Sequence, residues 1–306
     1  MSDKEYEVLV IGGGPAGLSA ALYLARYDRE VALFDTGHGR SNWHQTNFNY
    51  LGFPGGVAIR DLVALGLEQI MAYPQVTRHP HRVEHLRREN GGFVASGQAG
   101  TWRAPAVILC SGVVDHWPHF EDWQEYVGRS MFWCITCDGY SSRGMRIVVV
   151  GDTDDAGATA RQLLRFTDKV LVLTNSRNHT VSEKEQALLA EMQIPFIHDC
   201  IDRVEGQHGQ FEALYTERGQ CIELDRLFNQ QGATPRSDLA VAVGVEVTPA
   251  GYIIVDTEQK TNVPGFYAAG DVTYLHSHQV TTAVHEGGQA ASAANYNLYP
   301  TTLKED

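Results

Sequence analysis

Cys134 and Cys137, which are separated by two residues, have the spacing in this sequence that is best suited to chemistry. Two intervening residues let the sulfurs close a small disulfide ring, and a helix that starts at the pair lowers a thiolate pKa, so we expect the pair to cycle between dithiol and disulfide. A purely structural disulfide is disfavoured in a reducing cytosol. Cys200 and Cys221 do not form a second such pair, and a zinc site would need four suitably spaced ligands, so we expect no metal.

A glycine-rich turn near the N-terminus lies between an expected strand at residues 6–11 and an expected helix at residues 18–27. Gly12 would allow the tight turn, Gly14 would let the backbone approach a pyrophosphate, and Gly17 would let the helix pack on the strand. The phosphates of a dinucleotide would then face the positive N-terminus of the helix. The turn residues expected to bind a dinucleotide are Gly12, Gly14, Pro15, Ala16 and Gly17.

Asp35 ends a second expected strand, at residues 30–34, and can accept hydrogen bonds from a ribose. NAD and FAD both use this combination of turn and acid, so a further motif has to separate them. Residues 264–271 form a turn, a short apolar strand and a second acid, Asp271, and a polar loop then leads to an expected helix at residues 281–296. The cofactor site is therefore expected to draw on both ends of the chain.

These acids and the cysteine pair resemble those of the flavoprotein disulfide reductases. Residues 134–139 match the Cys-x-Thr-Cys-Asp-Gly signature of the low-molecular-weight thioredoxin reductases at all its defining positions. The resemblance implies FAD as cofactor, with Asp271 on the ribityl chain and the following helix aimed at the flavin, where its positive end stabilises negative charge on the reduced ring. It also implies that Cys137 faces the flavin, that Cys134 exchanges with an outside thiol and that Asp138 moves the thiol proton.

The same resemblance implies further contacts with the cofactor. Residues 109–112 end an apolar strand as the family's crossover does, which makes Cys110 a buried packing residue rather than a reactive thiol. Gln279 and Val280 would lie beside the flavin pyrimidine, and Gln45 stands in a region where the family has a flavin-contacting Gln, with a different spacing. The remaining residues expected at the cofactor are Val83, Gly112 and Gly270.

A second strand, turn and helix follow the cysteine pair, with strands expected at residues 145–150 and 169–173 and a helix at residues 156–166. In its turn, Thr153 replaces the second glycine, and three carboxylates crowd the phosphate position. They are Asp152, Asp154 and Asp155. The NADPH-dependent thioredoxin reductases have an arginine cluster for the 2′-phosphate after the second strand, whereas only Arg177 is nearby here. We therefore expect NADPH to bind poorly.

An intact flavin motif beside a lost NADPH motif resembles two branches of the family. In the ferredoxin-dependent and diflavin-linked branch, electrons come from a carrier protein or pass through a second FAD at the place of nicotinamide. In the other, thiols reduce the flavin through the disulfide and oxygen reoxidises it. Arg40 and Asn42, soon after the first acid, make this segment more similar to these two branches than to ordinary thioredoxin reductases. Over its whole length the chain most resembles the diflavin-linked enzymes. Three alternatives stay open: a thioredoxin reductase that uses ferredoxin or weakly bound NAD(P)H, an oxygen-dependent dithiol oxidase, and a flavin-binding regulatory protein, against which the intact cysteine pair argues.

The repeated units and the resemblance predict an α/β fold with two doubly wound, three-layer nucleotide-binding domains, the second inserted in the first. We expect a split FAD-binding domain at residues 1–112 and 244–306, and a central disulfide domain with a degenerate NADPH site at residues 113–243. Residues 232–235 are expected to form the turn that leads back into the first domain. A chain of 306 residues is long enough to bury two cores.

The composition limits the partners and the location of the protein. A net charge of −13 and a pI near 5.4 repel polyanions, so nucleic acid is not expected as a partner. The sequence has neither a leader pattern nor an apolar run long enough for a bilayer, so we expect a cytoplasmic protein and leave peripheral membrane contact open. The resemblance implies a homodimer that exchanges electrons with a thioredoxin-like protein or a small dithiol, with an electron carrier protein as a further candidate partner.

Histidines and tryptophans near these motifs allow two weaker interpretations. A histidine close to the flavin could shuttle protons, although loop histidines are more often solvated or cap helices. The candidates are His276, His278 and His285. Trp102, Trp117 and Trp123 are expected to pack in cores, whereas Trp133, which directly precedes Cys134, is a candidate for contact with a partner.

Overall fold

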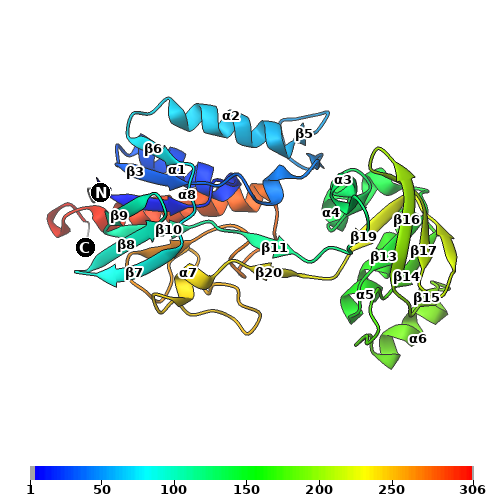
Figure 1. Cartoon of the computed structure of the whole chain (residues 1–306). Helices are drawn as coiled ribbons and strands as arrows, with labels where there is room; N and C mark the ends of the chain where they lie inside the picture. Colours follow the sequence, from blue (N-terminus) through cyan, green and yellow to red (C-terminus); the bar gives the residue numbers. More distant parts are fainter. Residues whose placement is uncertain (1–3, 305–306) are drawn as a thin grey trace. The chain divides into compact units, whose positions relative to one another are not determined.

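A computed structural model of the protein describes residues 4–304, which form two compact units (Figure 1). The first unit contains the residues up to Asn42, Ile59–Val114 and the residues from Thr234 onward, and the second contains Trp43–Ala58 and Asp115–Ala233. The second unit is thus inserted in the first, and both have α/β architecture. The segment Trp43–Ala58 groups by its contacts with the second unit, although it precedes most of the first unit in the sequence.

A five-stranded parallel sheet in the order β21–β10–β2–β3–β6 forms the centre of the first unit. Its strands are β2 (Val8–Ile11), β3 (Val31–Phe34), β6 (Val76–His79), β10 (Ala106–Leu109) and β21 (Phe266–Ala268). All residues of β2, β3 and β10 are buried, as expected for parallel strands that are covered on both faces. This sheet is the middle layer of a three-layer unit.

Helices cover one face of this sheet and a second sheet covers the other (Figure 1). The helices are α1 (Pro15–Arg26), α2 (Ile59–Met71) and α8 (Val280–Leu298). The second sheet contains β1 (Lys4–Glu5), β9 (Gly100–Ala104), β8 (Gly92–Gly97) and β7 (His85–Glu89), in that order. Along β2, Val8 and Val10 face the helices and Leu9 and Ile11 face the second sheet, so the strand alternation supplies both cores.

The second unit repeats this arrangement. Its parallel sheet has the order β12–β19–β13–β14–β15 and contains β12 (Met131–Phe132), β13 (Ile147–Val150), β14 (Val170–Leu173), β15 (Phe196–Ile197) and β19 (Arg226–Asn229). One face packs against α5 (Asp154–Leu163) and α6 (Glu183–Glu191). The other packs against the antiparallel sheet of β16 (Ile201–Gln207), β17 (Gln210–Thr216) and β18 (Cys221–Glu223). The doubly wound, three-layer fold is therefore confirmed.

Short elements complete the chain. The hairpin of β4 (Thr46–Asn47) and β5 (Val57–Ala58) lies in the segment Trp43–Ala58, and the short helices are α3 (Trp123–Tyr126), α4 (Ile135–Asp138) and α7 (Asp238–Val241). Single 3₁₀ turns occur at Arg40–Asn42, Tyr140–Ser142 and Thr301–Leu303. The prediction of a turn at residues 232–235 is wrong. Ala233–Pro235 forms strand β20, which pairs with β11 (Val113–Asp115).

The helices begin earlier than the sequence predicts. α1 starts at Pro15 because Gly14 is its N-cap and proline suits the first helical turn, where its missing N–H is not needed. α5 starts at Asp154, and acidic side chains are favourable at a helix N-terminus. Both helices therefore begin inside their turns.

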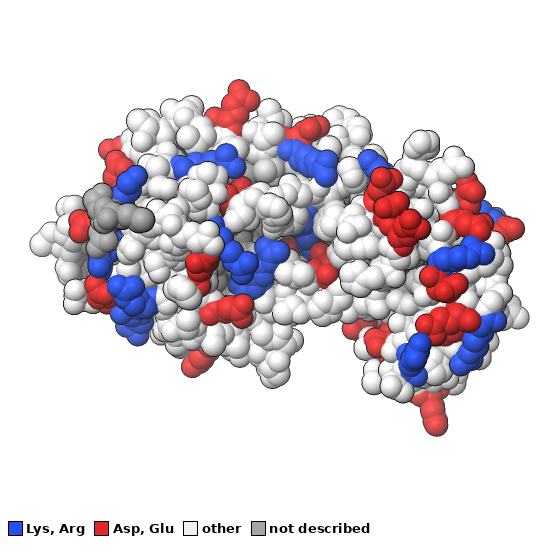
Figure 2. Space-filling model, in the orientation of Figure 1, with Lys and Arg blue, Asp and Glu red and all other residues white. Residues whose placement is uncertain are grey.

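The surface follows the acidic composition. On the face in Figure 2, the described Lys and Arg side chains lie in small groups among Asp and Glu. Within residues 4–304, no helix has both the length and the apolar character needed to cross a bilayer.

Candidate active site and cofactor-binding site

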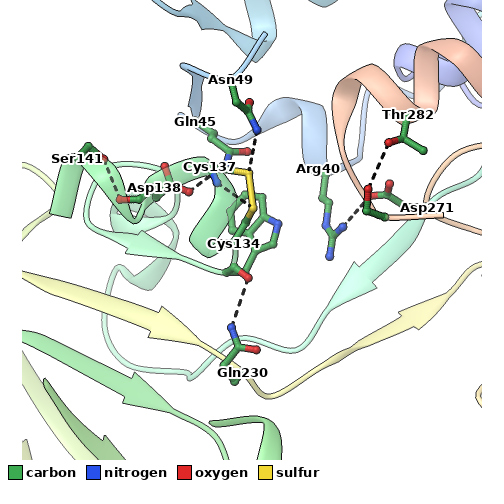
Figure 3. Close-up of a disulfide and its surroundings, with 12 residues drawn as sticks. Arg40, Gln45, Asn49, Cys134, Cys137, Asp138, Ser141, Gln230, Asp271 and Thr282 are labelled. Atoms are coloured by element: carbon green, nitrogen blue, oxygen red, sulfur yellow. Dashed lines mark hydrogen bonds and ion pairs between the residues drawn. A yellow bond between two sulfur atoms is a disulfide. The ribbon is translucent and has the colours of Figure 1, made fainter. Parts of the chain in front are cut away.

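Cys134 and Cys137 form a disulfide in the second unit (Figure 3). Strand β12 ends one residue before Trp133, and Cys134 is the N-cap of the single helical turn α4. The backbone N–H of Cys137 donates to Sγ of Cys134 at 3.2 Å. The pair therefore sits at the start of a helical turn, where a backbone donor reaches one of its sulfurs.

Asp138 follows the pair and is 2% exposed. Burial raises the pKa of its carboxyl group to about 7, although a hydrogen bond from Gln45 and the nearby charge of Arg226 act in the opposite direction. A carboxyl group with this pKa can hold a proton and release it near neutral pH. Its burial thus suits the predicted role of Asp138 in moving the thiol proton.

Gln45 lies beside Asp138 within the second unit. Its Nε2 donates to Oδ2 of Asp138 at 3.4 Å, and its side chain is buried (Figure 3). The resemblance implied a flavin contact for Gln45, and that role stays a prediction. Asn49, in the same segment, lies with Nδ2 3.8 Å from Sγ of Cys137. No local sequence pattern singles out Asn49 or Arg226, because both reach the site through tertiary contacts.

Two glycines of the N-terminal turn have room only for hydrogen. Gly12 has φ +115°, and a Cβ there would lie 2.1 Å from the carbonyl oxygen of Cys110. A Cβ on Gly17 would lie 1.8 Å from the carbonyl oxygen of Gly12. Glycine at these two positions lets the backbones at the junction of β2 and α1 approach closely. Cys110 is buried, as the sequence predicts, and burial raises its thiol pKa far above the usual range.

Gly14 differs from its neighbours, because a Cβ there would meet only Oγ of Ser41, at 3.7 Å. The fold itself therefore does not require glycine at this position. Gly14 is the N-cap of α1, a twelve-residue helix with Pro15 in its first turn, and a helix N-terminus presents free backbone N–H groups to an anion. The open space at Gly14 thus fits the pyrophosphate of FAD.

The first acid, Asp35, is held close to the same turn. A Cβ on Gly13 would lie 2.4 Å from Cγ of Asp35, and the N–H of Gly37 donates to Asp35 Oδ1 at 3.0 Å. Arg78 lies 3.8 Å from Oδ2 of Asp35. The side chain of Asp35 thus stays beside the turn, which fits the ribose contact that the sequence predicts.

The second acid, Asp271, follows β21 and forms an ion pair with Arg40 at 2.6 Å. Gly270 has φ +79°, and its N–H donates at 2.7 Å to Glu286 of α8, a carboxylate that is 1% exposed. A Cβ on Gly287 would lie 2.0 Å from the carbonyl oxygen of Ala16, so α8 packs very closely on α1. These contacts bring the C-terminal motif to the N-terminal turn within the first unit.

The other residues predicted at the cofactor occupy defined positions. Gln279 is the N-cap of α8 and Val280 is its first residue, Val83 is buried, and Gly112 has φ +67° with open space at its Cβ position. Contact with FAD stays a prediction for all of them. The full set is Gly12, Gly14, Pro15, Ala16, Gly17, Asp35, Gln45, Val83, Gly112, Gly270, Asp271, Gln279 and Val280.

Two of the three candidate histidines hold the loop before α8. His276 Nδ1 lies 2.9 Å from Oε1 of the buried Glu286, and His278 Nε2 lies 3.3 Å from the carbonyl oxygen of Thr273. His285 is exposed on α8. These contacts account for His276 and His278 as structural groups, and a proton-shuttling role stays a prediction. Among the described residues, no cluster of His, Cys, Asp and Glu has the arrangement of a metal site.

Four tryptophans of the second unit pack together near the disulfide. Trp117 is buried, and its ring centroid lies 5.3 Å from that of Trp133 and 6.1 Å from that of Trp123. The ring of Trp43 lies 6.0 Å from that of Trp117. The packing role expected for Trp117 and Trp123 is therefore confirmed, and Trp133 joins the same cluster.

The second turn, at residues 151–156, is engaged by the chain itself. Thr153 is the N-cap of α5, and the carboxylate of Asp154 accepts hydrogen bonds from the N–H and the hydroxyl of Ser182 at 2.6 and 2.9 Å. These bonds lower the pKa of Asp154. The N–H of Thr180 donates to the carbonyl oxygen of Asp152 at 2.7 Å, so the loop after β14 is fastened to this turn.

Arg177, the single arginine expected near a 2′-phosphate, already has a carboxylate partner. It lies 3.3 Å from Oε1 of Glu217 and is largely exposed. A guanidinium paired in this way is less available to a phosphate group.

The fold and the site together define a dinucleotide-binding disulfide oxidoreductase. The chain belongs to the pyridine nucleotide-disulphide oxidoreductase family, whose model matches residues 6–287. It is 28% identical over 318 aligned residues to the thioredoxin reductase of Listeria innocua, covering 99% of this chain and 96% of the relative. The protein is thus an FAD-dependent disulfide oxidoreductase of the thioredoxin reductase-like kind.

Solved structures agree with this assignment. The thioredoxin reductase of Streptococcus pyogenes superposes with a TM-score of 0.89 at 25% identity, covering 97% of this chain and 99% of that chain. The atypical thioredoxin reductase TRi of Desulfovibrio vulgaris Hildenborough is 31% identical and covers 95% of this chain and 97% of that chain, with a TM-score of 0.54.

Proposed function

We propose that the protein exchanges electrons between a dithiol partner and FAD through Cys134 and Cys137, and that NADPH is not its electron donor. The observation that carries the second part is the fastened turn at residues 151–156. The carboxylate of Asp154 and the backbone of Asp152 hold the loop after β14, at the place where a dinucleotide-binding turn presents free N–H groups to phosphate. Negative side chains in the first turn of α5 repel phosphate further.

The exchange with the partner is a two-electron reaction. A partner thiolate attacks Sγ of Cys134, the bond between Cys134 and Cys137 breaks, and Cys137 leaves as a thiolate. The second partner thiol then displaces Cys134, so the partner becomes a disulfide and the pair becomes a dithiol. Asp138 takes up or supplies the proton that Cys137 exchanges. FAD, when bound, accepts or returns the two electrons of the pair.

A thioredoxin-like protein is the partner that the similar proteins support best. The proposed direction is oxidation of the partner dithiol, as in the diflavin-linked enzymes, with a second FAD, a carrier protein or oxygen as the group that takes the electrons onward. Reduction of thioredoxin by weakly bound NAD(P)H is the alternative. A homodimer, a cytoplasmic location and a peripheral membrane contact stay predictions.

The first experiment measures flavin content and reduction by thiols under anaerobic conditions. We expect the purified protein to be yellow and the flavin to be bleached by dithiothreitol. One FAD per chain corresponds to the site at residues 12–17, and two would reveal the second flavin of the diflavin-linked branch. The Cys137→Ser variant should keep its flavin and lose bleaching. Flavin-loaded protein that no dithiol reduces, or equal bleaching in Cys137→Ser, would contradict the proposal.

A further inference from the structure

We propose that Asn49 is a catalytic residue of the disulfide, one that stabilises Cys137 in its thiolate form. The proposal rests on the thiol chemistry proposed above. Nδ2 of Asn49 lies 3.8 Å from Sγ of Cys137, and the amide points at the sulfur (Figure 3). A hydrogen bond to a charged acceptor is roughly twice as strong as a bond to a neutral one, so this N–H donor favours the thiolate over the thiol. Asn49 thus touches the sulfur that carries charge after the disulfide opens.

The segment Trp43–Ala58, which contains Asn49, is anchored in the second unit through its first three residues. A Cβ on Gly128 would lie 2.4 Å from the backbone nitrogen of Gln45, so glycine at 128 allows the two backbones to touch. His44 Nδ1 lies 3.3 Å from the guanidinium of Arg129, and the ring of Trp43 lies 5.8 Å from that of Trp123. The contact of Asn49 with the sulfur therefore belongs to an anchored hairpin.

The same segment reaches the proton-moving group. Gln45 donates to Asp138 at 3.4 Å, while Asn49 reaches the neighbouring residue, Cys137. The amides of Gln45 and Asn49 thus contact Asp138 and Cys137, the two groups between which a proton has to move. Residues 43–58 contain no Asp, Glu, Lys or Arg, and their one histidine, His44, faces Arg129.

Charged and titratable groups of the second unit come from α4, from β19, from Arg143 after the turn Tyr140–Ser142, and from the segment Trp43–Ala58. Asp138 lies in α4, and the guanidinium of Arg226 in β19 lies close enough to lower the pKa of Asp138. Arg143 lies over the ring of Tyr140, with its Cζ 4.6 Å from the ring centroid, and His44 faces Arg129. The amide of Asn49 is an uncharged donor to Sγ of Cys137, at 3.8 Å.

Reduction of the disulfide passes through a state in which Cys137 is an anion. The partner dithiol supplies two electrons and becomes a disulfide, and the bond between Cys134 and Cys137 breaks. Cys134 takes the proton of the partner thiol that displaces it, and Cys137 keeps a negative charge until Asp138 supplies a proton. The amide of Asn49 gives up no proton in this step. It lowers the energy of the intermediate in which Cys137 is charged.

The test measures the pKa of Cys137 directly in the full-length Cys134→Ser variant. The rate of alkylation by iodoacetamide is followed against pH on the peptide that contains Cys137, so that Cys200 and Cys221 do not contribute. Replacing Asn49 with Ala should slow alkylation at neutral pH by about tenfold, because the thiolate loses a charge-assisted hydrogen bond. Replacing Asn49 with Asp should slow it further, since a like charge then faces the sulfur. At alkaline pH, where the thiol is ionised in every variant, the rates should converge.

Leu51→Ala is the matched control, because Leu51 lies two residues further along the same segment and is 95% exposed. It should leave the alkylation profile unchanged. Identical profiles for Asn49→Ala, Asn49→Asp and the parent would overturn the proposal, as would a loss of rate that persists at alkaline pH. The readout needs neither flavin reduction nor a partner. A failure of dithiols to bleach the flavin would therefore refute the proposed function alone. The alkylation profiles would still decide whether Asn49 stabilises the thiolate of Cys137.

Discussion

The two strand–turn–helix motifs of this protein have the same scaffold and different chemistry. Each turn follows a fully buried parallel strand, begins with a glycine and leads to a helix whose N-cap is its third residue, Gly14 in the first and Thr153 in the second. Gly12 and Gly151 have the same structural task, since a Cβ at either would meet a backbone oxygen, at 2.1 and 2.7 Å. The positions that build the fold are thus retained in both motifs.

The motifs diverge where a phosphate would approach. The first turn of α1 has no acidic residue, and the space at Gly14 is open. The first turn of α5 has Asp154 and Asp155, and the carboxylate of Asp154 is bonded to Ser182. The residues that shape the turn and the residues that a phosphate would meet are therefore different, so the second can change while the first are kept.

The largest effect is predicted for flavin binding when the N-caps of α1 and α5 are replaced. Gly14→Val should abolish FAD binding while the protein still folds, because a Cβ at this position meets only Oγ of Ser41 in the protein and the side chain would occupy pyrophosphate space. Thr153→Val, at the equivalent cap, should leave the flavin content unchanged. Absorbance of released flavin per chain, with circular dichroism as the folding control, measures both. Full flavin in Gly14→Val would remove the cofactor assignment.

A second comparison tests the steric role of a glycine in each of the two turns. Gly17→Ala should destabilise the protein by about 3 kcal/mol, as overpacking of a closed contact does, since its Cβ would lie 1.8 Å from a backbone oxygen. Gly151→Ala, whose Cβ would lie 2.7 Å from the carbonyl oxygen of Gln230, should cost less. Chemical denaturation gives the two free energies of unfolding. Equal or reversed costs would show that the clearance around the added Cβ does not set the loss of stability.

A third prediction concerns how the free energy of unfolding depends on pH through Asp138 of the second unit. The pKa of Asp138 is about 7 in the folded protein, whereas an exposed aspartate has an ordinary pKa of 3.8, so the folded state binds more protons than the unfolded chain between these two pH values. Its contribution to stability is therefore present at low pH and is lost as the pH rises toward 7. Because a tenfold change in proton affinity corresponds to about 1.4 kcal/mol, the free energy of unfolding should fall by a few kcal/mol between pH 4 and pH 8.

The isosteric variant Asp138→Asn isolates this contribution. It should show a flatter pH dependence and should be more stable than the parent at pH 8. Urea denaturation of both proteins at a series of pH values gives the difference. Parallel curves for parent and variant would mean that Asp138 does not titrate near neutrality.

The smallest effect is predicted for thermal stability when Asp154 is replaced in the turn at residues 151–156. Asp154→Ala removes the two hydrogen bonds to Ser182 and should lower the melting temperature by no more than about 4 °C. It should not restore reduction by NADPH, because Thr153 and the paired Arg177 remain. Ser182→Ala is the matched variant on the other side of the contact. NADPH-dependent flavin reduction in Asp154→Ala would show that this one carboxylate was the barrier.

Local patterns predicted most of the fold. The apolar runs that became β2, β13 and β14 could be located because parallel strands buried on both faces contain almost no polar residues. The antiparallel sheets were not predicted, because strands such as β7 and β16 alternate with exposed and charged residues and have no motif attached. The glycine turns were predictable because their spacing reflects a steric requirement.

The surroundings of the disulfide could be predicted only in part. Cys134, Cys137 and Asp138 are adjacent in the sequence, so one motif contains them all. Gln45, Asn49 and Arg226 reach the same place from distant parts of the chain, and the raised pKa of Asp138 follows from burial that no short pattern encodes. The fastening of Asp154 to Ser182 likewise depends on how a loop folds back.

The most direct test of the central claim is an anaerobic titration that compares NADPH with a dithiol as reductant of the flavin. The purified protein is mixed with micromolar NADPH, and the flavin absorbance is followed before dithiothreitol is added. A charge-assisted contact with phosphate is worth roughly 1.5–3 kcal/mol, so the acidic turn and the paired Arg177 should weaken NADPH binding by at least a few orders of magnitude. We predict that NADPH leaves the flavin oxidised and that the dithiol then bleaches it. Rapid, stoichiometric bleaching by NADPH would contradict the account of residues 151–177.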